Sequence, residues 1–456
     1  MKAAKSGVWL LLTIELALLG SLSGCRNATG LPRPDHIIII LVDALRPDHL
    51  GCYGYAGNVS PNIDRLARGG ALFENAYSNA PWTKPSVATL FTSLYPNVHR
   101  AIDRFDTLSE KALTLAERLK KDGYFTGFIN NGNALLHNFN YDQGFDFYDY
   151  SESLDSTMAV RTFSSFLNQA EGRKTFVYIH LMDTHLPYHP AESNRNLAAT
   201  LPPDFRPGAL DRDKIRELTS SGKLGEQDKQ SLISLYDSQI RWADQRIGEL
   251  VSALESRRLL RTTLLLLTSD HGEELWDHGN YEHGHSLYEE VLRVPLIMTG
   301  PGVPATRLRS RVRHVDILPT IMESVEPGFR TDGLAGRSFS PYLKRDKGKR
   351  FVFATGTIHG DEKYGLIEGD RKIIINTGYR EKKRKLIGPH SADAVELYDL
   401  ARDPHEQKNL RFDERQVLGR LMKEIARLMD ATPAFQPGKR AIDKETEERL
   451  KSLGYL

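Results

Sequence analysis

A run of seven residues, His36-Ile37-Ile38-Ile39-Ile40-Leu41-Val42, decides the fold class of this chain. It is almost wholly apolar and shows no polar alternation, which is typical of a parallel strand buried on both faces. Two later runs, 175–181 and 262–268, have the same character, and an apolar stripe at helical spacing extends over 233–254. Strands that alternate with long helices predict an α/β fold, in which helices sandwich a large, mainly parallel sheet.

The chain is long enough for more than one domain, with 456 residues of which 40% are hydrophobic. We expect a main domain over 35–345 and a smaller C-terminal α+β domain over 346–430, with a charged stretch at 345–350 between them. A tail over 431–456 should end in a short helix, and the polar segment from about 197 to 230 should be an excursion on the surface. The small domain is expected to hold strands at 350–355, 372–377 and 395–400 and a helix at 416–429.

The charge of the chain is nearly balanced, with 61 basic and 59 acidic residues and a net charge of +2. Neither this balance nor any basic-aromatic patch indicates binding to nucleic acid, so we expect no such partner.

The N-terminal segment 1–25 has the pattern of a secretory signal. Lys2 and Lys5 precede a mostly apolar run that is too short to span a bilayer comfortably. The run ends in Leu-Ser-Gly at 22–24 just before Cys25, which resembles the lipobox of bacterial lipoproteins. Lipidation of Cys25 would anchor the exported protein to a bacterial membrane, on the periplasmic side or at the cell surface. The alternative is a plain cleaved signal. Cys52 is then the one remaining cysteine, and we interpret it as a packed residue.

A hydroxyl stands just before a proline-started helical pattern, in Pro81-Trp82-Thr83-Lys84-Pro85. Proline suits the first helical position, so we expect the helix to begin at Pro85 with Thr83 at or beside the cap. The free N–H groups and the dipole of a helix N-terminus attract sulfate or phosphate.

Acidic and histidine residues follow each of the buried strands. Ligand sites in open parallel sheets form at the carboxyl ends of the strands, so these residues should converge there. Oxygen and imidazole ligands suit a hard or borderline divalent cation. The residues concerned are Asp43, Asp183, His185, Asp270, His271, His283 and His285.

These motifs together resemble the sulfatase family, within the alkaline phosphatase superfamily, over roughly 35–410. The resemblance implies that Asp43, Asp270 and His271 bind one divalent metal, often Ca²⁺, and that position 83 holds the nucleophile on that metal. It also implies that His185 and His283 contact the anionic group of the substrate or protonate the leaving oxygen. The motifs that carry it are Val42-Asp43-Ala44-Leu45-Arg46, Ser269-Asp270-His271-Gly272, His283-Gly284-His285-Ser286-Leu287-Tyr288, His314-Val315-Asp316 and Glu396-Leu397-Tyr398-Asp399.

Three departures from the family pattern change the expected chemistry. The family's formylglycine arises from Cys or Ser, whereas position 83 is Thr, and Val87 replaces the signature arginine. Oxidation of threonine would give only a ketone, so formylglycine chemistry is not expected. Ala44 replaces a second ligand aspartate, which leaves the metal one ligand fewer and makes Mn²⁺ or Zn²⁺ alternatives to Ca²⁺.

An unmodified threonine is still a competent nucleophile when a cation lowers the pKa of its hydroxyl. The sequence therefore predicts an exported, metal-dependent hydrolase that attacks an anionic ester of a glycan, lipid or small molecule through Thr83. Phosphate or phosphonate esters are favoured over sulfate esters, because a sulfated threonine cannot expel sulfate by elimination. The alternatives are a phosphoryl or head-group transferase of the cell envelope and a catalytically degenerate anion-binding protein.

Other residues have secondary roles in this interpretation. Arg104 and Lys84 are candidate substrate contacts that would replace missing polar groups of the family, although an exposed lysine is the simpler interpretation of Lys84. His285 competes with His283 for the same role. The Asp183–His185 segment is an alternative source of ligands for a second metal. The pair at 273–274 is expected to begin a helix.

Overall fold

The computed structural model describes residues 30–131, 139–151, 155–188, 212–379, 395–430, 435–440 and 444–452. The signal segment and Cys25 lie outside these residues, so export and lipidation stay predictions. Within the described ranges, no helix combines the length and the apolar character that a membrane crossing requires.

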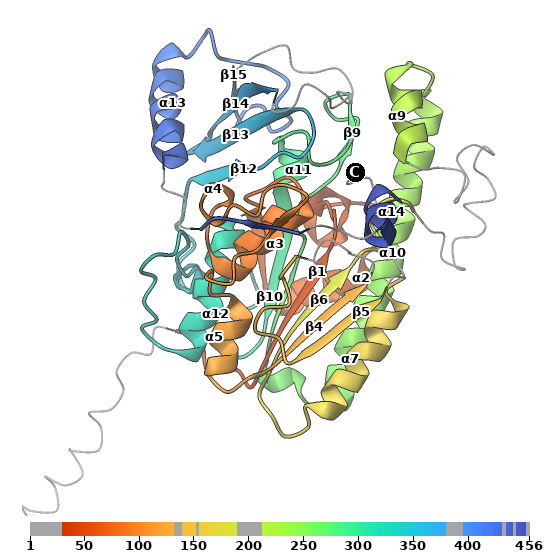
Figure 1. Ribbon diagram of the computed structural model, residues 1–456, viewed down its shortest axis with the longest axis vertical. Coiled ribbons are helices and arrows are strands. Elements are labelled where there is room, and N and C mark those ends of the chain that lie inside the picture. Colours follow the sequence, from red (N-terminus) through yellow and green to blue (C-terminus); the bar gives the residue numbers. More distant parts are fainter. Residues whose placement is uncertain are drawn as a thin grey trace, which may run out of the picture.

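A sheet of eight strands forms the centre of the molecule (Figure 1). Strand β10 runs antiparallel to both of its neighbours, and the other neighbouring pairs are parallel. The mainly parallel sheet that the apolar runs predicted is thus confirmed. In spatial order the strands are β11 (Thr306–Arg313), β2 (Ala71–Tyr77), β10 (Arg293–Thr299), β7 (Thr263–Thr268), β1 (His36–Val42), β6 (Thr175–Leu181), β4 (Phe125–Asn131) and β5 (Phe147–Ser151).

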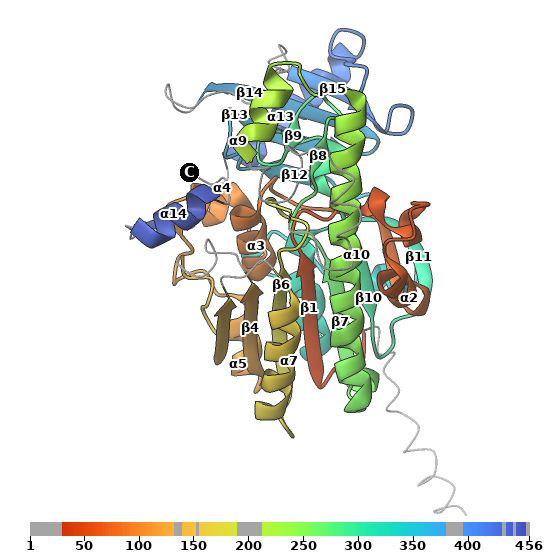
Figure 2. The same cartoon turned by 90° about the vertical axis from the view of Figure 1, so that its right-hand side faces the viewer.

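Helices cover both faces of this sheet because strand β1 is apolar on both sides. Ile37, Ile39 and Leu41 pack with α3 (Thr83–Thr92), α5 (Leu115–Lys121) and α12 (Ile317–Val325). The alternate residues Ile38 and Ile40 pack on the other face. Their partners there are α2 (Pro61–Gly69), α7 (Thr157–Gln169) and the long helix α10 (Glu226–Ser256), which Figure 2 shows lying along the sheet.

The C-terminal subdomain is a four-stranded antiparallel sheet, β12-β13-β14-β15. Helix α13 packs on one face of this sheet, and residues near α11 (Glu289–Leu292) of the main domain pack on the other. Strand β13 was not anticipated, because its sequence is polar at its start and contains Gly365. The elements are β12 (Val352–Thr355), β13 (Asp361–Glu368), β14 (Arg371–Tyr379), β15 (Val395–Asp399) and α13 (Arg415–Met429).

The polar segment that was expected to be a surface excursion is largely helical where it is described. Helix α9 spans Arg212–Ser220, α10 begins at Glu226, and most of the residues over 214–230 are exposed or half-buried. Residues 189–211 lie outside the described ranges.

The C-terminal tail returns to the main domain. Strand β16 (Gly438–Lys439) pairs with β3 (Asp106–Thr107), and Leu450 of α14 (Lys444–Ser452) is buried in the main core. The short helix expected at the end of the chain is present as α14. The remaining short elements are α4 (Pro96–His99), β8 (Glu274–Leu275) and β9 (Tyr281–Glu282).

Candidate active site

The carboxyl ends of β1 and β7 place three ligating side chains next to one another. Asp43 directly follows β1, while Asp270 and His271 come just after β7, which pairs in parallel with β1. One ligand atom of each residue lies within 4.8 Å of the other two. All three side chains are fully buried. The structure thus brings together the residues that the sequence proposed as metal ligands.

The donor atoms of this cluster fit a cation. Asp43 Oδ1 and Asp270 Oδ2 are buried and accept no hydrogen bond, which is costly for a carboxylate unless a positive charge lies nearby. Nδ1 of His271 lies 2.8 Å from the Gly272 carbonyl, so Nδ1 carries the proton and Nε2 presents its lone pair. That nitrogen is 3.3 Å from Asp270 Oδ2. Two carboxylates and one imidazole with converging lone pairs are a suitable donor set for a divalent cation.

The second oxygen of Asp43 is held by a chain of two buried residues on β6. His180 Nε2 lies 3.0 Å from Asp43 Oδ2, and the hydroxyl of Tyr178 lies 2.7 Å from His180 Nδ1. Although burial alone would raise the pKa of Asp43, the hydrogen bond from His180 and the nearby His185 and His271 hold it well below its ordinary value. Asp43 is therefore a carboxylate that only accepts, so His180 donates to it and Tyr178 donates to His180.

Sequence analysis missed His180. The available signal was a histidine two residues after a tyrosine, in a strand that is otherwise apolar. Residues two apart in a strand share a face, so both polar groups had to be satisfied on the same side of the sheet.

Asp270 is oriented by backbone groups. Its Oδ1 accepts hydrogen bonds from the N–H groups of Ala44 (3.2 Å) and His271 (3.0 Å). Burial and the adjacent charge of Asp43 raise the pKa of Asp270. Ala44 has a φ of 52°, in the left-handed region that a β-carbon disfavours. Ala44 thus contributes its backbone N–H to the site, and no carboxylate.

Thr83 lies directly at the metal cluster. Its Oγ1 is 3.2 Å from Asp43 Oδ2 and 3.3 Å from His271 Nε2, and the side chain is fully buried. Helix α3 begins at Thr83 itself, so Pro85 is its third residue and the predicted start at Pro85 is wrong by two positions. The first four N–H groups of a helix have no partner within it, so proline is tolerated here as well. The hydroxyl consequently stands on the first turn, at the positive end of the helix dipole.

Two histidines flank the cluster. The ring centroid of His283 is 4.1 Å from that of His271, and the ring of His185 is 5.3 Å from that of His283. His283 Nδ1 lies 3.0 Å from Glu273 Oε1, a carboxylate that orients the imidazole. The two predicted substrate-contact histidines therefore lie beside the predicted ligands.

The neighbouring histidine is held differently. His285 Nε2 lies 2.9 Å from Glu274 Oε2, and its Nδ1 lies 3.4 Å from the His283 carbonyl. Glu274 begins the short strand β8, so the prediction of a helix at 273–274 is wrong. Glu273 and Glu274 instead hold His283 and His285, respectively, through hydrogen bonds.

A loop of the C-terminal subdomain closes over this region. Between β12 and β13, the N–H groups of Ile358 and His359 donate to the Gly284 carbonyl (2.8 and 3.1 Å), and Trp82 donates to the Gly356 carbonyl (2.6 Å). Gly284 has a φ of 82°, and a β-carbon there would lie 2.6 Å from Ile358 Cγ2. Glycine is therefore required between the two histidines, and the subdomain brings His359 to the edge of the site.

Lys84 is fully buried, so the interpretation of an exposed lysine is wrong. Its Nζ donates to the carbonyls of Asp103 (3.1 Å) and Arg104 (2.8 Å) and lies 3.6 Å from the ring centroid of Phe139. Burial lowers the pKa of Lys84 well below its ordinary value. Lys84 directly follows the candidate nucleophile Thr83, and its side chain thus ties the 103–104 loop to the start of helix α3. Arg104 is half-buried in that loop, and its role as a substrate contact stays a prediction.

Asp183 lies outside the three-residue cluster. Its Oδ1 accepts hydrogen bonds from the N–H (3.3 Å) and the hydroxyl (2.9 Å) of Ser156, just before α7. Burial raises the pKa of Asp183 to about 7. This arrangement gives Asp183 a structural partner and favours the interpretation with one metal.

A helix-terminal hydroxyl, a cluster of cation ligands and two flanking histidines at the carboxyl edge of a mainly parallel sheet define an ester hydrolase of the alkaline phosphatase superfamily. Two family models match the chain: that of the sulfatases over 35–326, and that of the C-terminal part of N-sulphoglucosamine sulphohydrolase over 276–431. The chain belongs to the sulfatase family.

Relatives and solved structures agree with this assignment. A Delta 4,5-hexuronate-2-O-sulfatase from Bacteroides thetaiotaomicron is 23% identical over 447 residues, which cover 89% of this chain and 90% of the relative. The structure of BT4656 in complex with its substrate D-glucosamine-2-N,6-O-disulfate matches with a TM-score of 0.70 at 20% identity, over 89% of this chain and 100% of that protein. A phosphonate monoester hydrolase of Agrobacterium radiobacter matches with a TM-score of 0.69 at 20% identity, over 90% and 100%. The structural matches support the same fold.

Proposed function

We propose that this protein is a metal-dependent hydrolase that cleaves phosphate or phosphonate esters, with sulfate esters as the alternative, through Thr83 as nucleophile. The observation that carries the proposal is the position of Thr83 Oγ1, 3.2 Å from Asp43 Oδ2 and 3.3 Å from His271 Nε2. We assign to this unmodified hydroxyl the role that the resemblance to sulfatases gives to position 83.

The side chains of Asp43, Asp270 and His271 would hold the cation, with the Thr83 hydroxyl beside it. When bound, the cation supplies Lewis acidity, which lowers the pKa of a hydroxyl and stabilises negative charge on the substrate. The unsatisfied Asp43 Oδ1 and Asp270 Oδ2 support this assignment.

The reaction proceeds in two displacements at phosphorus or sulfur. The Thr83 hydroxyl gives its proton to solvent, Oγ forms a bond to that atom as the bond to the ester oxygen breaks, and the leaving oxygen takes a proton from His283. Water then attacks the Thr83 ester and gives one proton to His283, which releases the oxyanion, and the departing Thr83 oxygen takes a proton from solvent to restore the hydroxyl. His185 offsets charge on the non-bridging oxygens. Glu273 holds Nδ1 of His283 and so fixes the orientation of the imidazole.

The threonine favours phosphorus over sulfur as the attacked atom. A formylglycine hydrate has a second hydroxyl with which it can expel sulfate by elimination, whereas a threonine ester needs a second attack. The likeness to a phosphonate monoester hydrolase supports the first substrate class, and the hexuronate 2-O-sulfatase among the relatives supports the second.

The N-terminal segment supports export and anchoring of the enzyme. Lys2 and Lys5, the apolar run and Cys25 form the pattern of a lipoprotein signal. We place the enzyme at a bacterial membrane, held by lipid on Cys25.

The test compares Thr83→Ala with Thr92→Ala, a matched change at the other end of helix α3. Purified proteins are assayed with bis(4-nitrophenyl) phosphate, 4-nitrophenyl phenylphosphonate and 4-nitrophenyl sulfate. Thr83→Ala should lower turnover at least about 10³-fold, and Thr92→Ala should leave it near the wild-type level. Mass spectrometry of quenched wild type should show a phospho- or sulfo-threonine at position 83. Equal rates in wild type and Thr83→Ala would reject the nucleophile. Higher product yield with added acceptor alcohols would indicate a transferase.

A further inference from the structure

A pocket of about 330 Å³ lies at the junction between the main sheet and the C-terminal subdomain, away from the candidate active site. Strands β2, β10 and β11 supply one wall, and the β13–β14 turn and the segment after β15 supply the other. We call it the junction pocket. Its charged lining consists of Arg293, Arg309, Arg311, Lys349, Glu289 and Asp370.

The two carboxylates of the junction pocket already have partners. Glu289 accepts from the hydroxyl of Tyr77 (2.9 Å) and from Lys372 Nζ (3.1 Å). Asp370 lies 3.3 Å from Lys349 Nζ. Arg309 lies 3.5 Å from Glu74 Oε2, so Arg311 and Arg293 are the two cations of the lining that have no carboxylate partner among the described residues.

Arg311 is the most deeply buried of the four cations, with only 9% of its surface exposed. Its guanidinium donates to the carbonyls of Arg350 (3.3 Å) and Gly369 (2.8 Å), while its Nε has no acceptor. Among the residues that the structure describes, no carboxylate lies within ion-pair distance of Arg311. A buried charge without a counter-ion is strongly unfavourable, and an anion in the pocket would offset that cost.

Arg293, on strand β10 of the same wall, likewise has no carboxylate partner among the described residues. It donates from Nε to the Glu74 carbonyl (3.0 Å), and no ion pair joins it to a described carboxylate. Tyr77 lies between the two arginines, with Arg311 5.9 Å from its ring centroid. Burial raises the pKa of Tyr77 well above its ordinary value, so its hydroxyl stays neutral and does not balance their charge.

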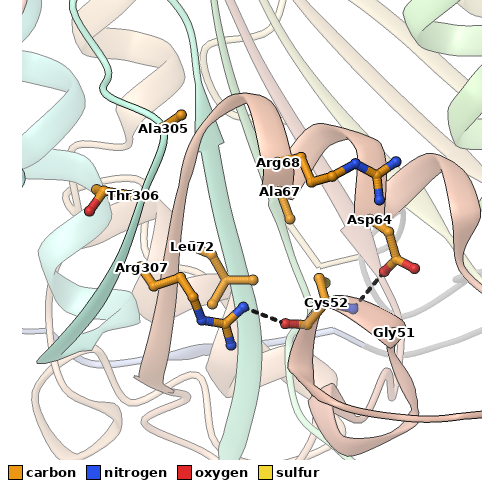
Figure 3. A pocket seen from close by; sticks show the side chains of 9 residues that line it. All are labelled: Gly51, Cys52, Asp64, Ala67, Arg68, Leu72, Ala305, Thr306 and Arg307. Carbon is orange, nitrogen blue, oxygen red and sulfur yellow. Dashed lines mark hydrogen bonds between the residues drawn. The ribbon is translucent and has the colours of Figure 1, made fainter.

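A larger cavity elsewhere shows that charge, and not size, distinguishes the junction pocket. The cavity in Figure 3 has a volume of about 460 Å³ and is lined by Arg307, Asp64 and Cys52 among others. There Arg307 pairs with Glu74 (3.0 Å) and donates to the Cys52 carbonyl (2.8 Å), while Asp64 accepts from the Cys52 N–H (2.7 Å). Arg307 is exposed and compensated, and Arg68, the other arginine of that lining, is exposed to solvent, so neither is a buried cation without a counter-ion.

We propose that the junction pocket binds a tetrahedral dianionic group, a sulfate or a phosphate, between Arg311 and Arg293. Guanidinium groups recognise such oxyanions with paired, charge-assisted hydrogen bonds. Arg309 and Lys349 complete the site at its exposed rim. Because Arg311 already holds two carbonyls at the subdomain side, the bound anion links the two parts of the molecule and stabilises their contact. This site is separate from Thr83 and does not depend on the proposed function.

The proposal is tested by calorimetric titration of inorganic sulfate and phosphate into the full-length protein. The ionic strength is kept constant, and chloride serves as the reference anion. The double variant Arg309→Gln/Lys349→Gln removes two charges from the exposed rim, and Arg311→Gln removes the buried one. Arg307→Gln is the matched control, since it lies on the same strand β11 and also pairs with Glu74. The rim variant should weaken oxyanion binding about tenfold and Arg311→Gln should abolish it, while Arg307→Gln binds as wild type.

Two further measurements complete the test. Sulfate should raise the midpoint of thermal unfolding of wild type and of Arg307→Gln, and should raise it less in the rim variant. Glucose 6-sulfate distinguishes an esterified group from the free ion. An ester ligand would be indicated if glucose 6-sulfate binds more tightly than inorganic sulfate and if the rim variant weakens that binding. Oxyanion binding that is equal in wild type and the rim variant, or that chloride reproduces, would overturn the proposal.

Discussion

Nε2 of His180 donates a hydrogen bond to Oδ2 of Asp43 over 3.0 Å, and both side chains are fully buried. The bond occupies the oxygen of Asp43 that also faces Thr83 and leaves Oδ1 to the cation site. Residues that orient a ligand in this way affect metal affinity without touching the metal.

Replacement of His180 should therefore weaken metal binding. We expect His180→Phe to lower the affinity for the activating cation about 10- to 100-fold, because Asp43 loses its donor. His180→Gln keeps an N–H donor and should restore part of the affinity, and Tyr178→Phe should have a smaller effect. Calorimetric titration of chelator-treated protein measures this directly. His99→Phe, which alters another buried histidine bonded to Thr89, is the control. Metal affinity that is unchanged in His180→Phe would show that the bond has only a packing role.

His283 and His285 should differ sharply in their contribution to turnover. His283 lies 4.1 Å from the His271 ring, whereas Glu274 holds Nε2 of His285. We expect His283→Asn to slow turnover about 10²- to 10⁴-fold, with the largest loss on substrates whose leaving groups are most basic. His285→Asn should lose less than about tenfold. A series of substituted aryl esters measures the dependence on the leaving group. If His285→Asn shows the steeper dependence, the two roles are exchanged.

Lys84 should make the stability of the protein depend on alkaline pH. Its pKa is lowered by burial, so the folded state binds fewer protons than the unfolded state and gains stability as pH rises toward the ordinary lysine value near 10.5. Lys84→Met removes this gain and leaves the carbonyls of Asp103 and Arg104 without their donor, at a cost of about 1 to 3 kcal/mol. Urea unfolding of both proteins between pH 7 and about 10 gives the comparison. A difference between the two proteins that does not change with pH would contradict the assignment.

Asp183 should make the stability of the protein fall, and not rise, as pH increases through the acidic range. Its folded-state pKa of about 7 lies above the unfolded value of 3.8, so the wild type loses stability as pH rises from 3.8 to 7. Asp183→Asn lacks this loss, so its free energy of unfolding should rise relative to that of wild type across this pH window. The difference should reach about 4 kcal/mol, at roughly 1.4 kcal/mol per pKa unit. Asp155→Asn is the control of opposite sign, since hydrogen bonds from Thr157 and Trp242 outweigh burial and lower the pKa of Asp155. A second metal ligand at 183 would instead make stability depend on added metal.

Several features of the fold were predictable because local sequence reports them. The apolar runs at 36–42 and 175–181 form strands buried on both faces, and the residues directly after them lie at the carboxyl edge of the sheet. The parallel arrangement then requires Asp43 and Asp270 to be neighbours. The position of Thr83 followed from its helix, although the helix begins two residues earlier than its proline suggested.

Other features had no local signal. Lysine side chains are usually exposed, and nothing in the local sequence marks Lys84 as an exception. It is buried because Phe139 and the loop at 103–104 pack around it. The role of His180 depends on the register that aligns β6 with β1. The approach of the β12–β13 loop to Gly284 joins segments more than 70 residues apart. Such contacts depend on how distant elements pack, which no short pattern encodes.

The sequence by itself determined the chemistry available to this protein: a plain threonine, two aspartates and a set of histidines at strand ends, with no signature cysteine, serine or arginine at 83 and 87. Only the tertiary structure decided which oxygen of Asp43 is committed to His180, which histidine stands next to His271, and where arginines meet without counter-ions. The physical reason is that bond-forming groups and burial tendencies are properties of single residues and short runs. Hydrogen-bond partners and uncompensated charge are properties of distances between segments, which exist only once the chain has packed.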